Sequence, residues 1–171
     1  MLMHDIQPDE VERVTIGMLE VGIPVICEPT ERKRRPLNVV DAQFSLPFGV
    51  AVALAKRRAG LEEFSPSLLQ DPFVQKLMSK VGYARDPGLE KNYPKEWPAW
   101  ARVNLQDGRE VAAHVRFPKG DPENPLSWDE LIDKYRTLAG AVWAREKVDK
   151  GQNAVRQLEQ TKRLRDLTRL L

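Results

Sequence analysis

The stretch DAQFSLPFGVAVALAKRRAGLEEF, residues 41–64, decides how this chain folds. Its twelve residues from Phe44 to Ala55 include a single polar side chain, Ser45, and a basic cluster follows them. A membrane-spanning helix needs about 20 apolar residues, so this run is too short to cross a bilayer. Apolar side chains would cover every face of a helix here. The run therefore predicts a helix buried on all sides, in the core or in the wall of an active site.

The composition is that of a globular protein without a strong charge bias. The 171 residues are 42% hydrophobic and 30% charged, enough for one domain or for one domain with a helical extension. The formal net charge of +2 lacks the strongly basic face that is typical of nucleic-acid binding. The single cysteine, Cys27, cannot form an intramolecular disulfide, and no signal peptide is recognisable. We therefore expect a cytoplasmic location.

Three segments have the period of two that is typical of β-strands. Apolar side chains alternate along residues 11–18, and again along residues 99–105 and 111–117. Asp107-Gly108 separates the last two runs, which predicts a hairpin because the turn requires a positive backbone φ. By contrast, residues 20–40 contain three prolines and predict a long loop, and residues 83–98 predict a turn-rich surface segment.

Helix signals fill the rest of the chain. Ser65-Pro66 and Asp71-Pro72 each place a capping side chain before a proline at the first helical position. Ser127 and Glu130 have the spacing of a capping box. Leucines at helical spacing continue through residues 142–171. The sequence thus predicts an α+β fold, with a small antiparallel sheet and helices followed by C-terminal helices.

The residue types offer no self-sufficient catalytic or metal-binding set. The two histidines, His4 and His114, and Cys27 are too few for a tetrahedral zinc site, and no glycine-rich phosphate loop is present. We therefore expect no metal and no cofactor, and assign no catalytic residue. The run ERKRR, residues 31–35, has no interleaved aromatic and indicates a solvated loop rather than a nucleic-acid site. If it borders a pocket, its arginines suit the recognition of carboxylates.

Four segments together resemble the C-terminal part of the MmgE/PrpD family. They are residues 41–64, DPFVQKLMSKV, the hairpin around LQDGRE, and FPKGDPENPLSWDELIDKYRTLA, in the family's order and spacing. The family includes 2-methylcitrate dehydratase, cis-aconitate decarboxylase and iminodisuccinate epimerase. The resemblance implies a lid domain over residues 1–122 and, over residues 123–171, helices that return to a separate helical domain. It also implies an active site in the cleft between the domains, with most acid–base residues in the helical domain.

The same resemblance points to candidate site residues and to a departure. The sequence begins after the position expected for the family's lid histidine, and His4 lies too late to replace it. The connection over residues 25–35 carries a polar residue in the family, in some members a tyrosine, and here only Thr30 matches loosely. The first turn of the long apolar helix would approach the cleft. The candidates for contact with substrate are Thr30, Arg34, Arg35, Gln43 and Ser45.

Two hypotheses follow for the function. The first is a lid-domain polypeptide of a lyase for small tricarboxylates, inactive alone and partnered by a helical catalytic domain or subunit. The alternative is a non-catalytic module that associates with itself or with another protein through the C-terminal helices. A third and weaker hypothesis is nucleic-acid binding through ERKRR and the basic tail. Neither main hypothesis involves a membrane.

Overall fold

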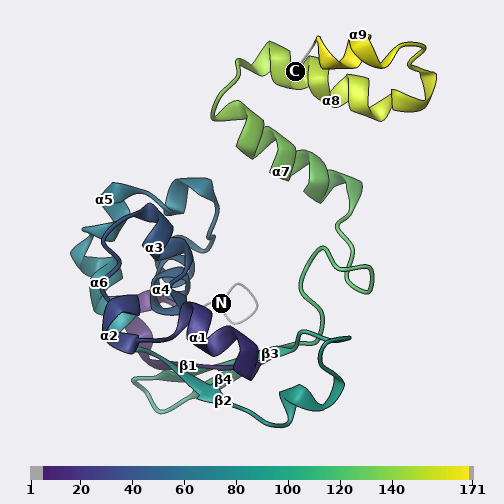
Figure 1. Cartoon of the computed structure of the whole chain (residues 1–171). Helices are drawn as coiled ribbons and strands as arrows, with labels where there is room; N and C mark the ends of the chain where they lie inside the picture. The colour runs from purple at the N-terminus through teal and green to yellow at the C-terminus, as the bar shows by residue number, and fades with distance from the viewer. Residues whose placement is uncertain (1–5, 170–171) are drawn as a thin grey trace. The chain divides into compact units, whose positions relative to one another are not determined.

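The computed structural model describes residues 6–169, and the chain forms two compact units, Met1–Pro118 and Lys119–Leu171. The first unit contains one sheet of four strands in the order β2-β1-β3-β4 (Figure 1). The strands are β1 (Val11–Met18), β2 (Val81–Arg85), β3 (Ala99–Leu105) and β4 (Glu110–Val115). Helices and strands occur in the same unit, which confirms the predicted α+β class. The sequence had placed the division after residue 122, and the compact unit ends at Pro118.

The sheet is mixed, whereas the sequence predicted antiparallel pairing. β1 pairs antiparallel with β3, and β3 with β4 around the turn where Gly108 has φ +85°, as the hairpin signature predicted. β2 instead runs parallel to β1, with Val14 beside Val81 and Ile16 beside Tyr83. A parallel pair requires a long crossover, and residues 19–80 with their helices provide it.

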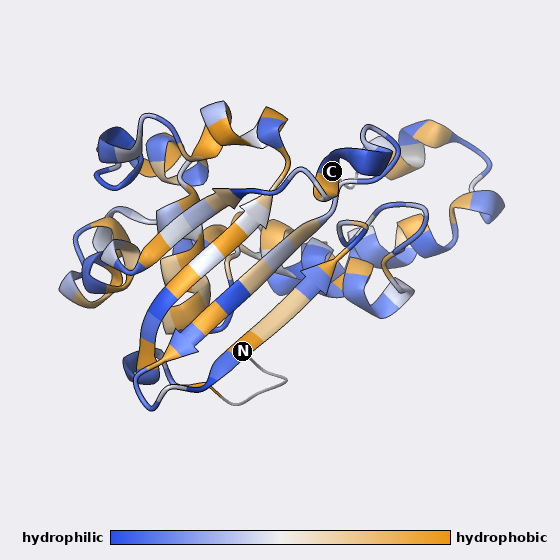
Figure 2. Ribbon diagram, turned by 90° about the horizontal axis from the view of Figure 1, so that it is seen from below, coloured by the Kyte–Doolittle hydropathy of each residue, from blue (hydrophilic) through white to orange (hydrophobic). Residues whose placement is uncertain are grey.

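Helices of the crossover lie over one face of the sheet (Figure 1), and Figure 2 looks at the opposite face, with the strands in front. They are α1 (Ile23–Ile26), α2 (Thr30–Lys33), α3 (Val39–Gln43), α4 (Leu46–Lys56), α5 (Pro66–Leu69) and α6 (Pro72–Ser79). The loop expected over residues 20–40 is therefore wrong in part, because two single-turn helices form there. Short 3-10 turns occupy Pro8–Glu10, Glu20–Gly22, Leu61–Glu63 and Leu89–Asn92.

The long apolar helix is α4, and it forms the centre of the core. Phe48, Ala51 and Val52 have no exposed surface. They pack with buried residues of β1 and α6, among them Val14 and Leu77. The helix starts at Leu46 rather than Phe44, because Ser45 caps it. The side chain of Phe44 consequently stays 49% exposed.

The second unit is helical. It consists of α7 (Trp128–Gly140), α8 (Arg145–Arg156), a 3-10 turn at Leu158–Gln160, and α9 (Leu164–Thr168). The predicted capping box is present, since Ser127 Oγ accepts from the Glu130 N–H and the Glu130 carboxylate accepts from the Ser127 N–H. Part of the apolar stripe on these helices is solvent-exposed, including Trp128, Leu138 and Leu164.

Candidate functional site

All five candidate residues lie between α2 and the start of α4. Thr30 is the first residue of α2, and Arg34 is its C-cap residue, with Arg35 directly after it. Gln43 ends α3 and is exposed, whereas Ser45 is only 3% exposed. The structure brings Thr30 and Arg34 together at one pocket, and Arg34 and Arg35 together at another. Gln43 and Ser45 line neither of these two pockets.

The Ser45 hydroxyl has its hydrogen bonds inside the protein. Its Oγ donates to the carbonyl oxygen of Lys33 and accepts from the Phe48 N–H at 3.1 Å. The bond to Lys33 links the end of α2 to the start of α4, and the bond from Phe48 caps α4. Ser45 therefore positions α2 relative to α4.

The first pocket, which we call the inner pocket, lies between α2, the start of α4 and β2. It encloses about 180 Å³ and is lined by Cys27, Thr30, Arg34, Leu46, Pro47, Val81, Gly82 and Tyr83. Arg34 reaches it by donating from Nη2 to the carbonyl oxygen of Val81, at 3.2 Å. Its remaining N–H donors have no carboxylate partner among residues 6–169.

The sequence did not point to Tyr83, which brings a phenol to the inner pocket. Its hydroxyl donates to Glu28 Oε1 at 2.8 Å, and Thr30 lines the same pocket. The hydrogen bond to the Glu28 carboxylate, together with burial, raises the pKa of Tyr83. Arg85 Nη2 stands 3.8 Å from the same Glu28 oxygen. The alternation of Val81, Tyr83 and Arg85 could have predicted strand β2, but Gly82 and Ala84 between them weaken the pattern.

Cys27, also at the inner pocket, is a buried thiol without an activating environment. Burial is the main cause that raises its pKa to about 11, and the neighbouring Glu28 carboxylate adds to the effect. Its Sγ donates to Met18 Sδ at 3.4 Å. A thiol with such a pKa carries almost no thiolate at neutral pH and is a poor nucleophile.

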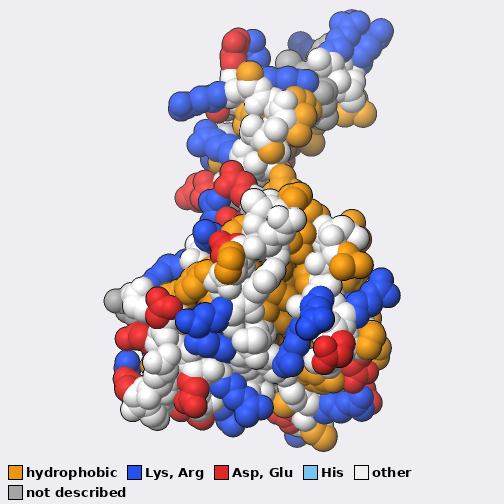
Figure 3. All heavy atoms as spheres, turned by 90° about the vertical axis from the view of Figure 1, so that its left-hand side faces the viewer, with side chains coloured by type: hydrophobic (Ala, Val, Ile, Leu, Met, Phe, Trp, Pro, Cys, Tyr) orange, Lys and Arg blue, Asp and Glu red, His pale blue; other side chains and the backbone are white. Residues whose placement is uncertain are grey.

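The second pocket, which we call the outer groove, runs between the end of α2 and α5–α6. It has a volume of about 530 Å³ and is lined by Glu31, Arg34, Arg35, Pro36, Leu37, Leu69, Gln75, Met78 and Ser79. Figure 3 looks onto the side of α5 and α6, where basic and hydrophobic side chains lie next to each other. Within residues 6–169 the Arg35 side chain has no ion pair. Glu31 is the one acid among the lining residues, so arginine outnumbers carboxylate there.

The other cations of the ERKRR run already have protein partners. Arg32 Nη2 lies 3.8 Å from Asp41 Oδ1, and Lys33 Nζ donates to the carbonyl oxygen of Val25. Both residues line a separate groove of about 390 Å³ between α1 and α3, together with Phe44. Arg34 and Arg35 are thus the cations of the run that remain available to an anion.

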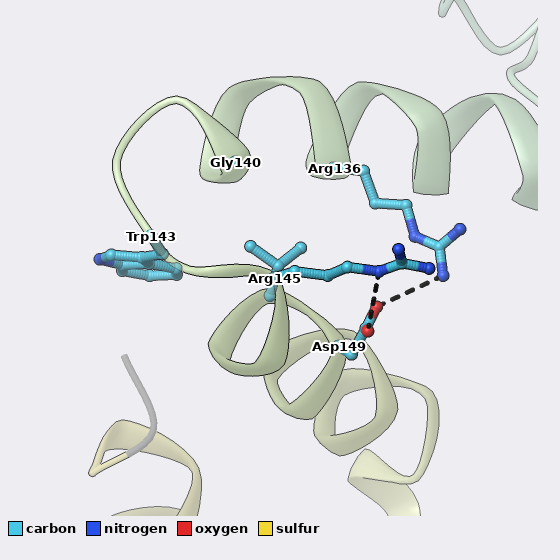
Figure 4. Close-up of a pocket in the computed structure, with 6 residues that line it drawn as sticks. Arg136, Gly140, Trp143, Arg145 and Asp149 are labelled. Atoms are coloured by element: carbon cyan, nitrogen blue, oxygen red, sulfur yellow. Dashed lines mark ion pairs between the residues drawn. The ribbon is translucent and has the colours of Figure 1, made fainter.

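A pocket of the second unit contains two arginines that, unlike Arg34 and Arg35, form ion pairs with a carboxylate. It holds about 290 Å³ between α7 and α8. Arg136 and Arg145 both point at Asp149, with separations of 3.5 Å and 3.9 Å (Figure 4). The carboxylate offsets one of the two positive charges, and its pairing with Arg136 links α7 to α8. This pocket is therefore a weaker candidate for anion binding than the outer groove.

The site residues offer donors and positive charge but no histidine, and the Glu28 carboxylate accepts a hydrogen bond from Tyr83. His114 lies on β4 opposite Trp100 and is exposed, and His4 lies outside the described residues. Residues 6–169 contain no cluster of three or more His, Cys, Asp or Glu side chains that could hold a metal ion. The arrangement is suited to holding a carboxylate.

Fold and site thus describe an α+β domain with two neighbouring arginines that form no ion pair among the described residues, and sequence comparison gives its family. The profile of the MmgE/PrpD C-terminal domain matches residues 1–160. The chain belongs to the MmgE/PrpD family.

Curated relatives carry the names of decarboxylases. Cis-aconitate decarboxylase of Aspergillus terreus is 30% identical over 141 residues, which are 81% of this chain and 28% of that protein. The cis-aconitate decarboxylase-like protein oryM of Aspergillus oryzae is 28% identical over 168 residues, 96% of this chain and 33% of that protein. The chain spans about a third or less of the length of these relatives.

Among the described residues, none of the helices combines the length and the apolar character that a bilayer crossing requires.

Proposed function

We propose that this chain is the lid-type, C-terminal part of an MmgE/PrpD lyase that acts on a small tricarboxylate such as cis-aconitate or 2-methylcitrate. It holds substrate carboxylates, while the acid–base groups come from a helical catalytic domain or subunit. The names of the relatives support the substrate class, and their greater length supports the need for further residues. A cytoplasmic location fits the single reduced cysteine.

The observation that carries this proposal is the pair of available arginines. Arg34 and Arg35 share the outer groove, and neither forms an ion pair with a carboxylate within residues 6–169. A guanidinium binds a carboxylate through two parallel hydrogen bonds, which suits substrates with several carboxylates. Lyases of such acids also need a positioned base and acid, and the grooves around α2 contain no histidine.

A turnover assay on the purified chain tests the proposal. The chain is incubated with cis-aconitate and, separately, with 2-methylcitrate, and loss of each substrate is followed over time. We expect no turnover above that of a buffer blank, because the site has no histidine and its Glu28 carboxylate is already held by Tyr83 and lies near Arg85. Turnover at enzyme-like rates by the chain alone would overturn the proposal, since its own residues would then suffice.

A second candidate function is self-association, favoured by an apolar groove in the second unit. About 230 Å³ lies between α7 and α8, lined by Trp128, Leu131, Ile132, Tyr135, Gln152, Val155 and Arg156. Trp128 at its edge is 64% exposed. A large exposed apolar surface is typical of an interaction site.

Sedimentation over a wide concentration range tests this second candidate. Self-association predicts a mass that rises with concentration and falls back to that of a monomer in Leu131→Glu. The matched control is Lys134→Glu, also on α7 but outside the lining of the groove. A strictly monomeric wild-type chain would exclude this function.

A further inference from the structure

We propose that the inner pocket binds one carboxylate arm of the ligand, and that Tyr83 is its orienting hydrogen-bond donor alongside Arg34 and Thr30. This inference rests on the proposed function and adds to it a site and a residue on β2. Drug-sized ligands occupy pockets of about 300–1,000 Å³. The roughly 180 Å³ of the inner pocket suits a single small arm of an acid rather than a whole large ligand.

Three polar side chains from two elements, α2 and β2, meet at this pocket. Thr30 and Arg34 come from the two ends of α2, and Tyr83 comes from the edge strand β2. The remaining lining is mostly apolar, with Leu46, Pro47 and Val81. Hydrogen bonds to an anion are stronger where apolar neighbours limit the access of water. The convergence of a guanidinium and two hydroxyls therefore favours a carboxylate over a neutral ligand.

Arg34 is held in place without being neutralised. Its Nη2 donates to the Val81 carbonyl oxygen at 3.2 Å, and both residues line the pocket. A carbonyl takes one N–H and leaves the positive charge in place, unlike Asp149, whose negative charge is shared by two arginines of the second unit. The remaining N–H groups can donate to both oxygens of a carboxylate.

Glu28 is the built-in competitor for the Tyr83 hydroxyl. In the absence of ligand the phenol donates to Glu28 Oε1 at 2.8 Å. When a ligand carboxylate enters, the phenol turns its O–H toward the ligand. The Arg85 guanidinium, 3.8 Å from Glu28 Oε1, then balances the negative charge of Glu28. Removing the charge of Glu28 should therefore tighten ligand binding. A purely structural Tyr83 would not produce this effect.

The test is a titration of the full chain with cis-aconitate at fixed pH and ionic strength. Binding is measured by isothermal titration calorimetry and by the changes in amide NMR shifts. We expect Arg34→Gln to weaken binding roughly tenfold or more, and Tyr83→Phe roughly three- to tenfold. Glu28→Gln should tighten it roughly threefold, because a like charge leaves the site. Arg109→Gln is the charge-matched control, since Arg109 pairs with Asp107 at the β3–β4 turn. Tyr93→Phe is the control for loss of a phenol.

The outcomes separate this inference from the proposed function. If Arg34→Gln weakens binding while Tyr83→Phe and Glu28→Gln bind as the wild-type chain does, the inner pocket is not the site, and the proposed function stands on the arginines of the outer groove. If the wild-type chain shows no binding up to millimolar cis-aconitate, the inference is wrong, and the turnover assay still decides the proposed function. Circular dichroism and urea unfolding of each variant show whether a loss of binding reflects unfolding, and Glu28→Gln tests the site by a gain instead of a loss.

Discussion

Replacing Gly17 with alanine should damage the sheet through a single contact. Gly17 on β1 lies directly opposite Trp100 on β3, and the indole ring covers the glycine. A Cβ at Gly17 would stand 1.9 Å from Trp100 Cε2. Carbon atoms need about 3.5–4.0 Å between them, so the ring must move by roughly 1.5 Å or more. The ring is not free to move, because Nε1 donates to Asp86 Oδ2 at 2.7 Å and Arg102 stacks on its face.

The expected cost of Gly17→Ala is about 1–3 kcal/mol of unfolding free energy, the usual range for overpacking. Urea unfolding followed by circular dichroism measures it. Gly49→Ala is the matched control: Gly49 lies inside α4, and nothing stands within 4 Å of an added Cβ. That change should stabilise the chain by about 0.5–1 kcal/mol, because alanine favours a helix interior over glycine.

A double substitution shows whether the ring is the cause. In Trp100→Ala the obstacle is absent, so adding Gly17→Ala should then cost close to nothing. Equal stability of Gly17→Ala and the wild-type chain would refute the reasoning. So would a cost that persists without the indole, because the clash could then not be its source.

Three further predictions concern the core, the ion pair between exposed Arg58 and buried Glu63, and the thiol. Phe48→Ala, at the centre of α4, should lower the unfolding free energy by about 3–5 kcal/mol in the same urea assay, because it leaves a cavity; a change below about 1 kcal/mol would contradict the core assignment. Burial by itself raises the pKa of Glu63, but hydrogen bonds from Arg58 and the Gly60 N–H outweigh it and leave the pKa below 4.5. The Glu63 carboxylate therefore stabilises the fold above its unfolded pKa, and this stabilisation is lost as pH falls through its folded pKa. In Glu63→Gln the unfolding free energy should fall less steeply at acid pH than in the wild-type chain. An equally steep fall would exclude a stabilising role of the Glu63 carboxylate. Cys27, with a pKa of about 11, should react with a disulfide reagent at pH 8 far more slowly in the folded chain than in urea; equal rates would show that the thiol is accessible.

The elements with strong local signals were predictable from the sequence. β1 and the β3–β4 hairpin follow from alternation and from Asp107-Gly108, whose turn needs the positive φ that glycine adopts. α4 follows from an apolar run too short for a membrane, and α6 and α7 from their caps. In each of these cases neighbouring residues alone carry the information.

β2 was not predictable, because pairing with β1 stabilises it. Its five residues, VGYAR, include Gly82 and Ala84, which weaken the alternation, and Asp86-Pro87 follows directly. The parallel partner lies more than 60 residues away along the chain, from Val14 to Val81. A tertiary contact thus overrides weak local propensity.

The candidate site was predictable only in part, for the same reason. The basic run pointed to Arg34 and Arg35, and the structure leaves these two without a carboxylate partner among residues 6–169. Ser45 was suggested by the family resemblance, which places the first turn of this helix near the cleft, but its hydroxyl is used to cap α4 and to hold α2. Tyr83 could not be assigned to the site, because its place depends on the β1–β2 register.

The most direct test of the account is the turnover of cis-aconitate by this chain alone and after affinity capture from an extract of its own source. The account predicts no turnover by the purified chain, and turnover in a captured complex that contains a second polypeptide supplying histidine acid–base groups. Arg34→Gln in the captured complex should reduce that turnover, whereas Arg109→Gln should leave it unchanged. Turnover by the chain alone at the rate of the complex would contradict the central claim that its own residues hold the substrate but do not move its protons.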